Sequence, residues 1–205
     1  MNYDILISFV LATSVLAILP GPDNIYVLLQ SISYGKLSGL ATVAGLISGC
    51  LVHTTLVAFG VSAVIKANEN LFLVIKIFGA AYLLYLSYKA YKSHPNLYLE
   101  AKNIPQKSLI QLFKQGVIMN VLNPKVSLFF LAMFPGFLFS NTLSNVTQFY
   151  VLGGLFMLVS LLIFSAVAIL SGMISDYIKQ HAQVGLYLKW LQIVVFILIA
   201  MMILI

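Results

Sequence analysis

The stretch Leu19-Pro20-Gly21-Pro22-Asp23-Asn24 interrupts an apolar segment near the start of the chain, and Leu122-Asn123-Pro124-Lys125 interrupts another just past the middle. Proline has no backbone N–H and clashes with the preceding helical turn, so each stretch is expected to break a helix. Each also places a charge, on Asp23 or Lys125, inside an apolar segment. In hydrocarbon, a broken helix and a charge are tolerated only where they face protein or water. The two breaks therefore predict a binding site.

The composition around these breaks is that of an integral membrane protein. The chain is 61% apolar and 8% charged, with a mean hydropathy of +1.04, whereas soluble domains carry about 25% charged residues. A spanning helix needs about 20 apolar residues, and the sequence predicts an all-α membrane protein with six such helices. The expected spans are residues 4–22, 40–65, 70–91, 114–139, 146–171 and 184–205.

The spacing of the breaks predicts an internal repeat. Pro124 follows Pro22 by 102 positions, which is about half of the chain. Because each half has three spans, the second half enters the membrane from the opposite side. We therefore expect one domain over 1–205, with inverted repeats at about 1–91 and 109–205 joined by a cytoplasmic loop, 92–108. Broken helices at matching positions of inverted repeats are typical of the midplane site of secondary transporters.

The net charge of +6 comes from lysine, because the chain has no arginine. On this chain it indicates membrane orientation rather than nucleic-acid binding. Most lysines fall in or beside the first, third and fifth loops: Lys36; Lys89, Lys92, Lys102, Lys107 and Lys114; Lys179 and Lys189. The positive-inside rule places these loops in the cytoplasm and both termini on the outer side.

Each break also creates a new helix start. Pro22 and Pro124 suit the first helical position, and Asn123 suits the N-cap before it. Unpaired N–H groups at a helix start bind carboxylates. If the two starts meet, these groups and Lys125 can hold the carboxylate of an amino acid while Asp23 holds its ammonium group. The residues expected to bind such a substrate are Pro20, Gly21, Pro22, Asp23, Asn24, Asn120, Asn123, Pro124 and Lys125.

Asp23 and His53 are the candidates for coupling transport to protons. Asp23 is the one acidic residue that we place away from a membrane interface, and His53 lies in the middle of the second expected span. Imidazole titrates near neutral pH, which suits a proton relay. Two structural alternatives stay open. Asp23 could pair with Lys125 to hold the halves together, and His53 could hydrogen-bond to a neighbouring helix.

At these residues the chain resembles the LysE/RhtB family of bacterial amino-acid exporters. The resemblance covers nearly the whole chain and includes the motif Phe113-x-x-Gly116-x-x-x-Asn120-x-x-Asn123-Pro124-Lys125. Where the family commonly shows Gly-Pro-Gly-Pro, this chain has Leu19 in place of the first glycine. The resemblance implies secondary active export of amino acids or their derivatives across the bacterial inner membrane, as an antiporter driven by a proton or ion gradient. In agreement, the chain has no Gly-x-x-x-x-Gly-Lys nucleotide-binding motif.

Three other classes of function compete with this interpretation. An intramembrane hydrolase is disfavoured because Ser48 and His53 lie on poorly matched helix faces, so we expect no enzyme and no catalytic residue. An exporter of a metal ion or another small solute stays open, although three scattered His and one Cys disfavour soft-metal ligation. A non-transporting scaffold would leave two costly breaks without a use. We expect no cofactor and no metal site. The expected partners are an amino acid, a coupling proton or Na⁺ and lipid, with a homo-oligomer left open.

Overall fold

A computed structural model describes residues 2–63, 69–93, 106–181 and 183–204, and the regular elements in these residues are helices. Four helices are long and apolar enough to cross a membrane, and two bent pairs raise the number to six if each pair is one span. The chain is therefore an all-α, multi-pass membrane protein. The elements are α1 (Tyr3–Ile18), α2 (Pro22–Tyr34), α3 (Lys36–Leu56) with its π-helical continuation η1 (Val57–Val61), α5 (Glu69–Lys92), α6 (Leu109–Val121), α7 (Pro124–Leu128) with its continuations η2 (Phe129–Met133) and η3 (Phe134–Phe137), α8 (Asn145–Ile169), α9 (Ser171–Gln180) and α10 (Val184–Leu204).

The two bent spans are the first and the fourth, as the proline breaks predict. α1 and α2 meet at 57°, and α6 meets the helical segment that begins with α7 at 48°. Pro22 is the first residue of α2 and Pro124 the first residue of α7, each preceded by an extended N-cap residue. Proline fits there because the first helical N–H has no partner within the helix.

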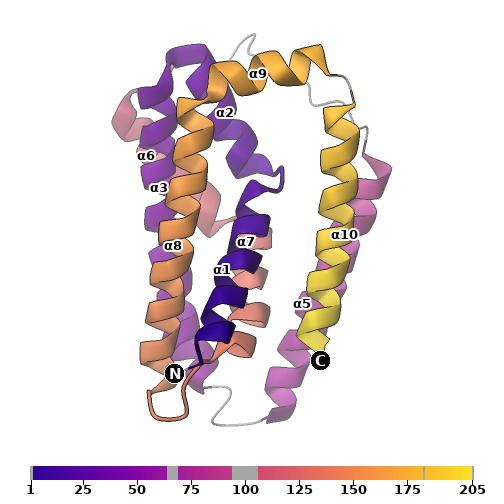
Figure 1. Cartoon of the computed structure of the whole chain (residues 1–205). Coiled ribbons are helices and arrows are strands. Elements are labelled where there is room, and N and C mark those ends of the chain that lie inside the picture. Colours follow the sequence, from indigo (N-terminus) through magenta and orange to yellow (C-terminus); the bar gives the residue numbers. More distant parts are fainter. Residues whose placement is uncertain (1, 64–68, 94–105, 182, 205) are drawn as a thin grey trace.

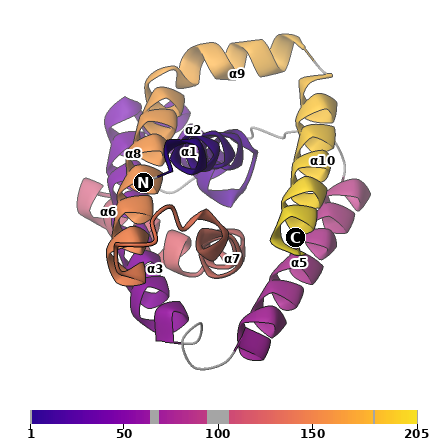
Figure 2. The same ribbon diagram turned by 60° about the horizontal axis from the view of Figure 1, so that its bottom comes forward.

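Matching helices of the two halves run in opposite directions (Figure 1). α1 and α2 lead from the end that holds both termini toward α9, whereas α6 and α7 lead away from α9. α3 and α8 are also opposed, as are α5 and α10. These are the helix directions that an inverted repeat requires, and the bounds of the two repeats stay a prediction. Figure 2 shows α1 and α7 side by side between the group formed by α3, α6 and α8 and the pair formed by α5 and α10.

Glycines bring α3 and α6 into close contact. A Cβ atom on Gly45 would overlap the Phe113 carbonyl, and one on Gly116 would overlap the Thr42 carbonyl. Small residues at such crossings let helix backbones approach where no hydrophobic effect drives them together. This close approach fixes α6, and with it the second break, against α3.

The first two spans differ in extent from the predictions. The first span continues to Tyr34 instead of ending near residue 22. The polar residues Asp23, Gln30 and Ser31 lower the hydropathy of α2, which is why the sequence predicts too early an end. These residues are buried against protein, so α2 can still lie in the membrane. The break therefore lies within the span and not at its end. Lys36 is the first residue of α3 and not a loop residue, since Gly35 alone connects the helices with a φ of +87°.

The fourth span begins at Leu109, earlier than the predicted residue 114. Ser108 and Gln111 form a reciprocal capping box that starts α6 at this point. Most of the predicted loop 92–108 lies outside the described residues.

The end of the bundle along which α9 runs is rich in lysine, and we call it the basic end. α3 begins there with Lys36, α5 ends there with Lys89 and Lys92, and Lys189 in the second turn of α10 donates to the Ser93 carbonyl at 2.8 Å. Both termini lie at the opposite end, which we call the terminal end (Figure 1). Lysines of the first, third and fifth loops thus gather at one end of the bundle, the pattern from which the positive-inside rule predicts orientation.

Candidate functional site

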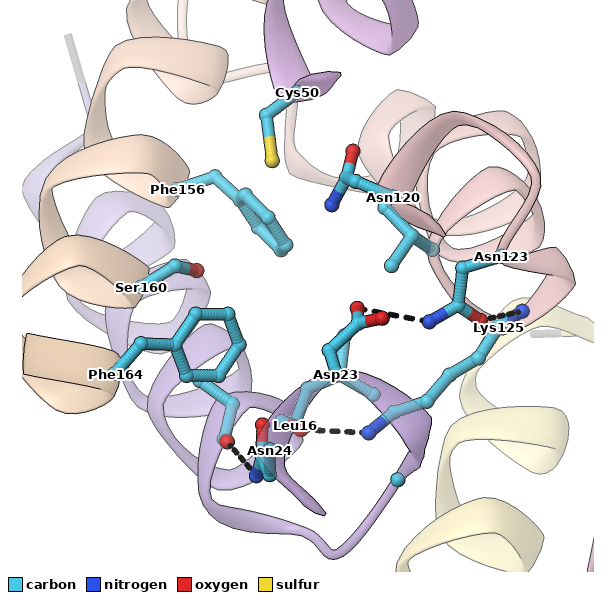
Figure 3. Close-up of a pocket in the computed structure, with 13 residues that line it drawn as sticks. Leu16, Asp23, Asn24, Cys50, Asn120, Asn123, Lys125, Phe156, Ser160 and Phe164 are labelled. Carbon is cyan, nitrogen blue, oxygen red and sulfur yellow. Dashed lines mark hydrogen bonds between the residues drawn. The ribbon is translucent and has the colours of Figure 1, made fainter. Parts of the chain in front are cut away.

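The two breaks face a single small cavity in the middle of the bundle (Figure 3). Its volume is about 30 Å³, which is enough for about two water molecules if each needs about 10–15 Å³. α1, α2, α3, α6, α7 and α8 all contribute to its wall. In this structure the cavity is too small for an amino acid.

Most of the predicted binding residues line this cavity. They are Gly21, Asp23, Asn24, Asn120, Asn123 and Lys125. The three predicted prolines do not line it. Pro22 and Pro124 begin the helices that carry the lining residues, and Pro20 lines a separate apolar cavity between α2, α8, α9 and α10.

The Asp23 carboxylate lies toward the centre of the cavity (Figure 3). Asp23 is only 6% exposed, and its Oδ2 accepts a hydrogen bond from Asn123 Nδ2 at 2.9 Å. Its Oδ1 is buried and has no hydrogen-bond partner within the described residues. A buried oxygen without a partner is costly, so it offers a strong acceptor to any donor that enters the cavity.

Asn123 connects the two breaks through both ends of its amide. Its Nδ2 donates to Asp23 at the first break, and its Oδ1 accepts from the Lys125 backbone N–H at 3.0 Å and so caps α7. The sequence predicted the cap from local rules. The bond to Asp23 spans one hundred positions of the chain and ties the orientation of the carboxylate to the start of α7.

Lys125 and Asn24 satisfy the carbonyl groups that the first break leaves unpaired. Lys125 Nζ donates to the Leu16 carbonyl at 2.9 Å and lies 3.5 Å from the Leu19 carbonyl. Asn24 Nδ2 donates to the carbonyls of Ala17 at 2.7 Å and Leu19 at 3.0 Å. The last carbonyls of a helix have no partner within it and carry partial negative charge, which a cation stabilises.

Lys125 and Asp23, both in the described part of the chain, do not form the ion pair that the sequence analysis left open. Asp23 is bonded to Asn123, and the Lys125 ammonium group is directed to the end of α1. Both hydrogen bonds nevertheless join the two halves at the site. As a result, Asp23 keeps an acceptor that no lysine neutralises by direct contact.

His53 lies beside the cavity and not in its wall. It is 5% exposed, and its Nε2 lies 3.1 Å from the Asn120 carbonyl on α6. This contact confirms the alternative of a hydrogen bond to a neighbouring helix. Asn120 is in the last turn of α6, before the second break. His53 thus contacts a carbonyl at the end of α6, as Lys125 contacts one at the end of α1. Its role in coupling stays a prediction.

One wall of the cavity comes from α8, which the sequence analysis did not include. Phe156, Ser160 and Phe164 line it together with Cys50 from α3. The Ser160 hydroxyl is buried and lacks a hydrogen-bond partner within the described residues. The spacing of four between these three α8 residues places them on one helix face. A lone serine between two phenylalanines in an apolar run was the available signal.

A cluster of aromatic rings lies on the side of the cavity that faces the terminal end. Phe130 and Phe134 stack at 4.1 Å between ring centroids, Phe9 meets Phe134 at 5.1 Å, and Phe156 meets Phe130 at 4.9 Å. Phe129 completes the group, 5.5 Å from Phe156. We call these five residues the aromatic plug. α7 leads from the break toward the terminal end (Figure 1), and its continuations η2 and η3 carry Phe129, Phe130 and Phe134, so the plug lies on that side of the break.

Comparison with known proteins gives one family. The sequence matches the LysE type translocators over residues 14–205. It is 28% identical to the homoserine/homoserine lactone efflux protein of Salmonella typhimurium over 183 residues, which cover 89% of this chain and 88% of the relative. The protein of the same description from Salmonella typhi matches equally over the same shares. The uncharacterized membrane protein YrhP of Bacillus subtilis is 32% identical over 151 residues, 70% of this chain and 71% of the relative. No solved structure matches. The chain belongs to the family of LysE type translocators.

Proposed function

We propose that this protein is a secondary exporter of amino acids or their derivatives, with its binding site at the cavity between the two breaks. The observation that carries the proposal is the free Oδ1 of Asp23 in a cavity to which both breaks contribute. The efflux relatives support the substrate class, because homoserine carries an ammonium group that a buried carboxylate binds well.

The two charged groups of an amino acid find different partners here. The ammonium group donates to Asp23. The carboxylate lies at the start of α2, where Gly21 provides no side-chain cap and the first N–H groups stay available. The start of α7 is less available, since the Lys125 N–H is bonded to Asn123. The predicted role of Lys125 in holding the carboxylate is thereby reduced to a supporting one, at the end of α1.

Transport requires the cavity to open to one side at a time. Each bend lets one half of a broken span tilt while the other half stays packed, which is how discontinuous helices serve alternating access. The small volume of the cavity fits a closed form that lies between the two open ones. Opening toward the terminal end would require the aromatic plug to separate.

Coupling to protons follows from competition for Asp23. A proton and an ammonium group cannot both occupy the free carboxylate oxygen, so protonation from one side releases the substrate there and makes the protein an antiporter. His53 contacts the same end of α6 through Asn120 and is the second candidate in the coupling. Na⁺ is the alternative ion, with oxygen ligands at the same place.

Orientation completes the proposal. The basic end faces the cytoplasm and both termini face the outside of a bacterial plasma membrane, following the positive-inside rule. The protein moves its substrate without chemical change and so is no enzyme.

The test is an export assay without a chosen substrate. Bacteria that lack their own exporters express this chain and are loaded with mixed dipeptides, and mass spectrometry measures the amino acids in the medium. We expect one or a few amino acids to accumulate faster than in cells with an empty vector. If a correctly inserted protein leaves the medium unchanged, the proposed function is wrong.

A further inference from the structure

One face of α2 carries a row of polar side chains that starts at the cavity. Asp23, Tyr26, Gln30 and Ser33 are spaced by three, four and three positions, which places them on one side of a helix with 3.6 residues per turn. Each has a buried polar atom without a hydrogen-bond partner within the described residues: Asp23 Oδ1, the Tyr26 hydroxyl, Gln30 Oε1 and Nε2, and the Ser33 hydroxyl. Gln30 is 0% exposed.

Within α2, the buried polar atoms without partners all lie on this face. Asn24, on another side of α2, donates to the end of α1, and the Ser31 hydroxyl donates to the Val27 carbonyl at 2.7 Å. Burying polar groups without partners opposes folding and insertion, in a membrane more than in water. A helix face that served packing alone would carry apolar residues. Unpaired groups at these positions indicate that they acquire partners in another state of the protein.

The row has the direction and the length of a path. α2 leads from the break to the basic end (Figure 1). Ten residues separate Asp23 from Ser33, about 15 Å at the rise of an α-helix, which is about half of a 30 Å hydrocarbon core. At the basic end α9 contacts α2 and contributes Ser175, which is 2% exposed and whose hydroxyl also lacks a partner within the described residues.

The opposite side of the cavity differs in chemistry. On the side of the terminal end the aromatic plug consists of apolar rings in contact with one another. On that side Thr13 of α1 is a single buried hydroxyl without a partner within the described residues, whereas toward the basic end the polar residues of α2 form a continuous row from the Asp23 cavity.

We infer that Tyr26, Gln30 and Ser33 line the route by which the substrate passes between the basic end and Asp23, a route that is closed in this structure. The inference rests on the proposed function. Neutral hydroxyl and amide groups both donate and accept hydrogen bonds. They can replace water around both charged groups of a zwitterion in turn and hold neither of them strongly.

The first test measures access of water-soluble reagent. Gln30→Cys and Ser33→Cys are reconstituted into liposomes and treated from either side with a cationic, membrane-impermeant methanethiosulfonate. All variants are made in a Cys50→Ala background, because Cys50 lines the cavity to which the route leads, and Cys50→Ala alone is the blank. Val27→Cys is the matched control, because Val27 is 0% exposed and packs among apolar side chains such as Ala17 and Val43. Lys36→Cys marks the basic end.

We expect Gln30→Cys and Ser33→Cys to react at least tenfold faster than Val27→Cys, and only from the side that labels Lys36→Cys. Equal rates at Gln30→Cys and Val27→Cys would overturn the inference, as would labelling from the terminal end alone. Labelling needs no transport, so the two claims are tested separately. Efflux without labelling rejects the route but keeps the proposed function. Labelling without efflux keeps an accessible path along α2 but rejects the proposed function.

The second test separates a route from a structural role. Gln30→Leu removes two unpaired polar atoms from a buried position, so we expect a higher unfolding temperature in detergent together with at least a tenfold lower efflux rate. If Gln30 instead stabilised the folded protein, Gln30→Leu would lower the unfolding temperature, and this result would overturn the inference. Unchanged efflux in a stabilised variant would also overturn the inference.

Discussion

Asn123 makes two bonds that can be removed separately, and this gives the sharpest test of the site geometry. Asn123→Ala loses the cap on α7 and the bond to Asp23, whereas Asn123→Ser keeps a capping oxygen and loses only the bond to Asp23. A helix cap contributes about 1 kcal/mol, and a hydrogen bond to a charged group contributes about 1.5–3 kcal/mol.

We therefore expect Asn123→Ser to lower the free energy of unfolding by about 1.5–3 kcal/mol and Asn123→Ala to lower it by about 1 kcal/mol more. Titration with sodium dodecyl sulfate in mixed micelles, followed by circular dichroism, measures these differences. Since Asn123 orients the Asp23 carboxylate, both variants should also weaken substrate binding to a similar degree. If both unfold like the parent chain, the bond between the breaks does not exist in the membrane. If only Asn123→Ala weakens binding, Asn123 acts through the cap and not through Asp23.

Two glycines and one lysine give further predictions. Gly49→Ala should lower the efflux rate about tenfold or more, because its Cβ would lie 2.8 Å from the Asn120 side chain and push it into the cavity. Gly154→Ala is the matched control and should stay near the parent rate, since its Cβ would meet no atom within 4 Å and Gly154 does not line the cavity; an inactive Gly154→Ala with an active Gly49→Ala would contradict this account. Lys125→Met keeps the length of the side chain but leaves the Leu16 carbonyl unpaired, so the unfolding temperature should fall even without substrate. If Lys125→Met loses efflux but keeps the unfolding temperature of the parent chain, Lys125 binds the substrate directly.

Local rules predicted the breaks but not the partners of the residues within them. Proline at a helix start and asparagine before it are preferences of single positions, so α2 and α7 begin where the sequence indicates. Whether Lys125 meets Asp23 or the Leu16 carbonyl depends on how the two broken spans lie against each other. That arrangement is set by packing across the whole bundle, including the glycine contact between α3 and α6.

Hydropathy likewise located the spans but misjudged their burial. Gln30 and Ser31 made the second half of the first span look too polar for a membrane, although both are buried in protein. Ser160 was missed for the opposite reason, since a single serine hardly changes the hydropathy of α8. In both cases the missing information was which face of the helix meets protein, and no average over a window of sequence contains it.

The central claim is that Asp23 holds the ammonium group of the substrate, and binding to Asp23→Asn tests it most directly. The purified protein in lipid nanodiscs is titrated with the amino acid that the export assay identifies, and the matched control is Asp176→Asn on the exposed side of α9. A lost bond between charged groups costs about 1.5–3 kcal/mol, so we expect affinity to fall about 10- to 150-fold in Asp23→Asn and to stay unchanged in Asp176→Asn. Binding by a folded Asp23→Asn as tight as by the parent chain would contradict the account.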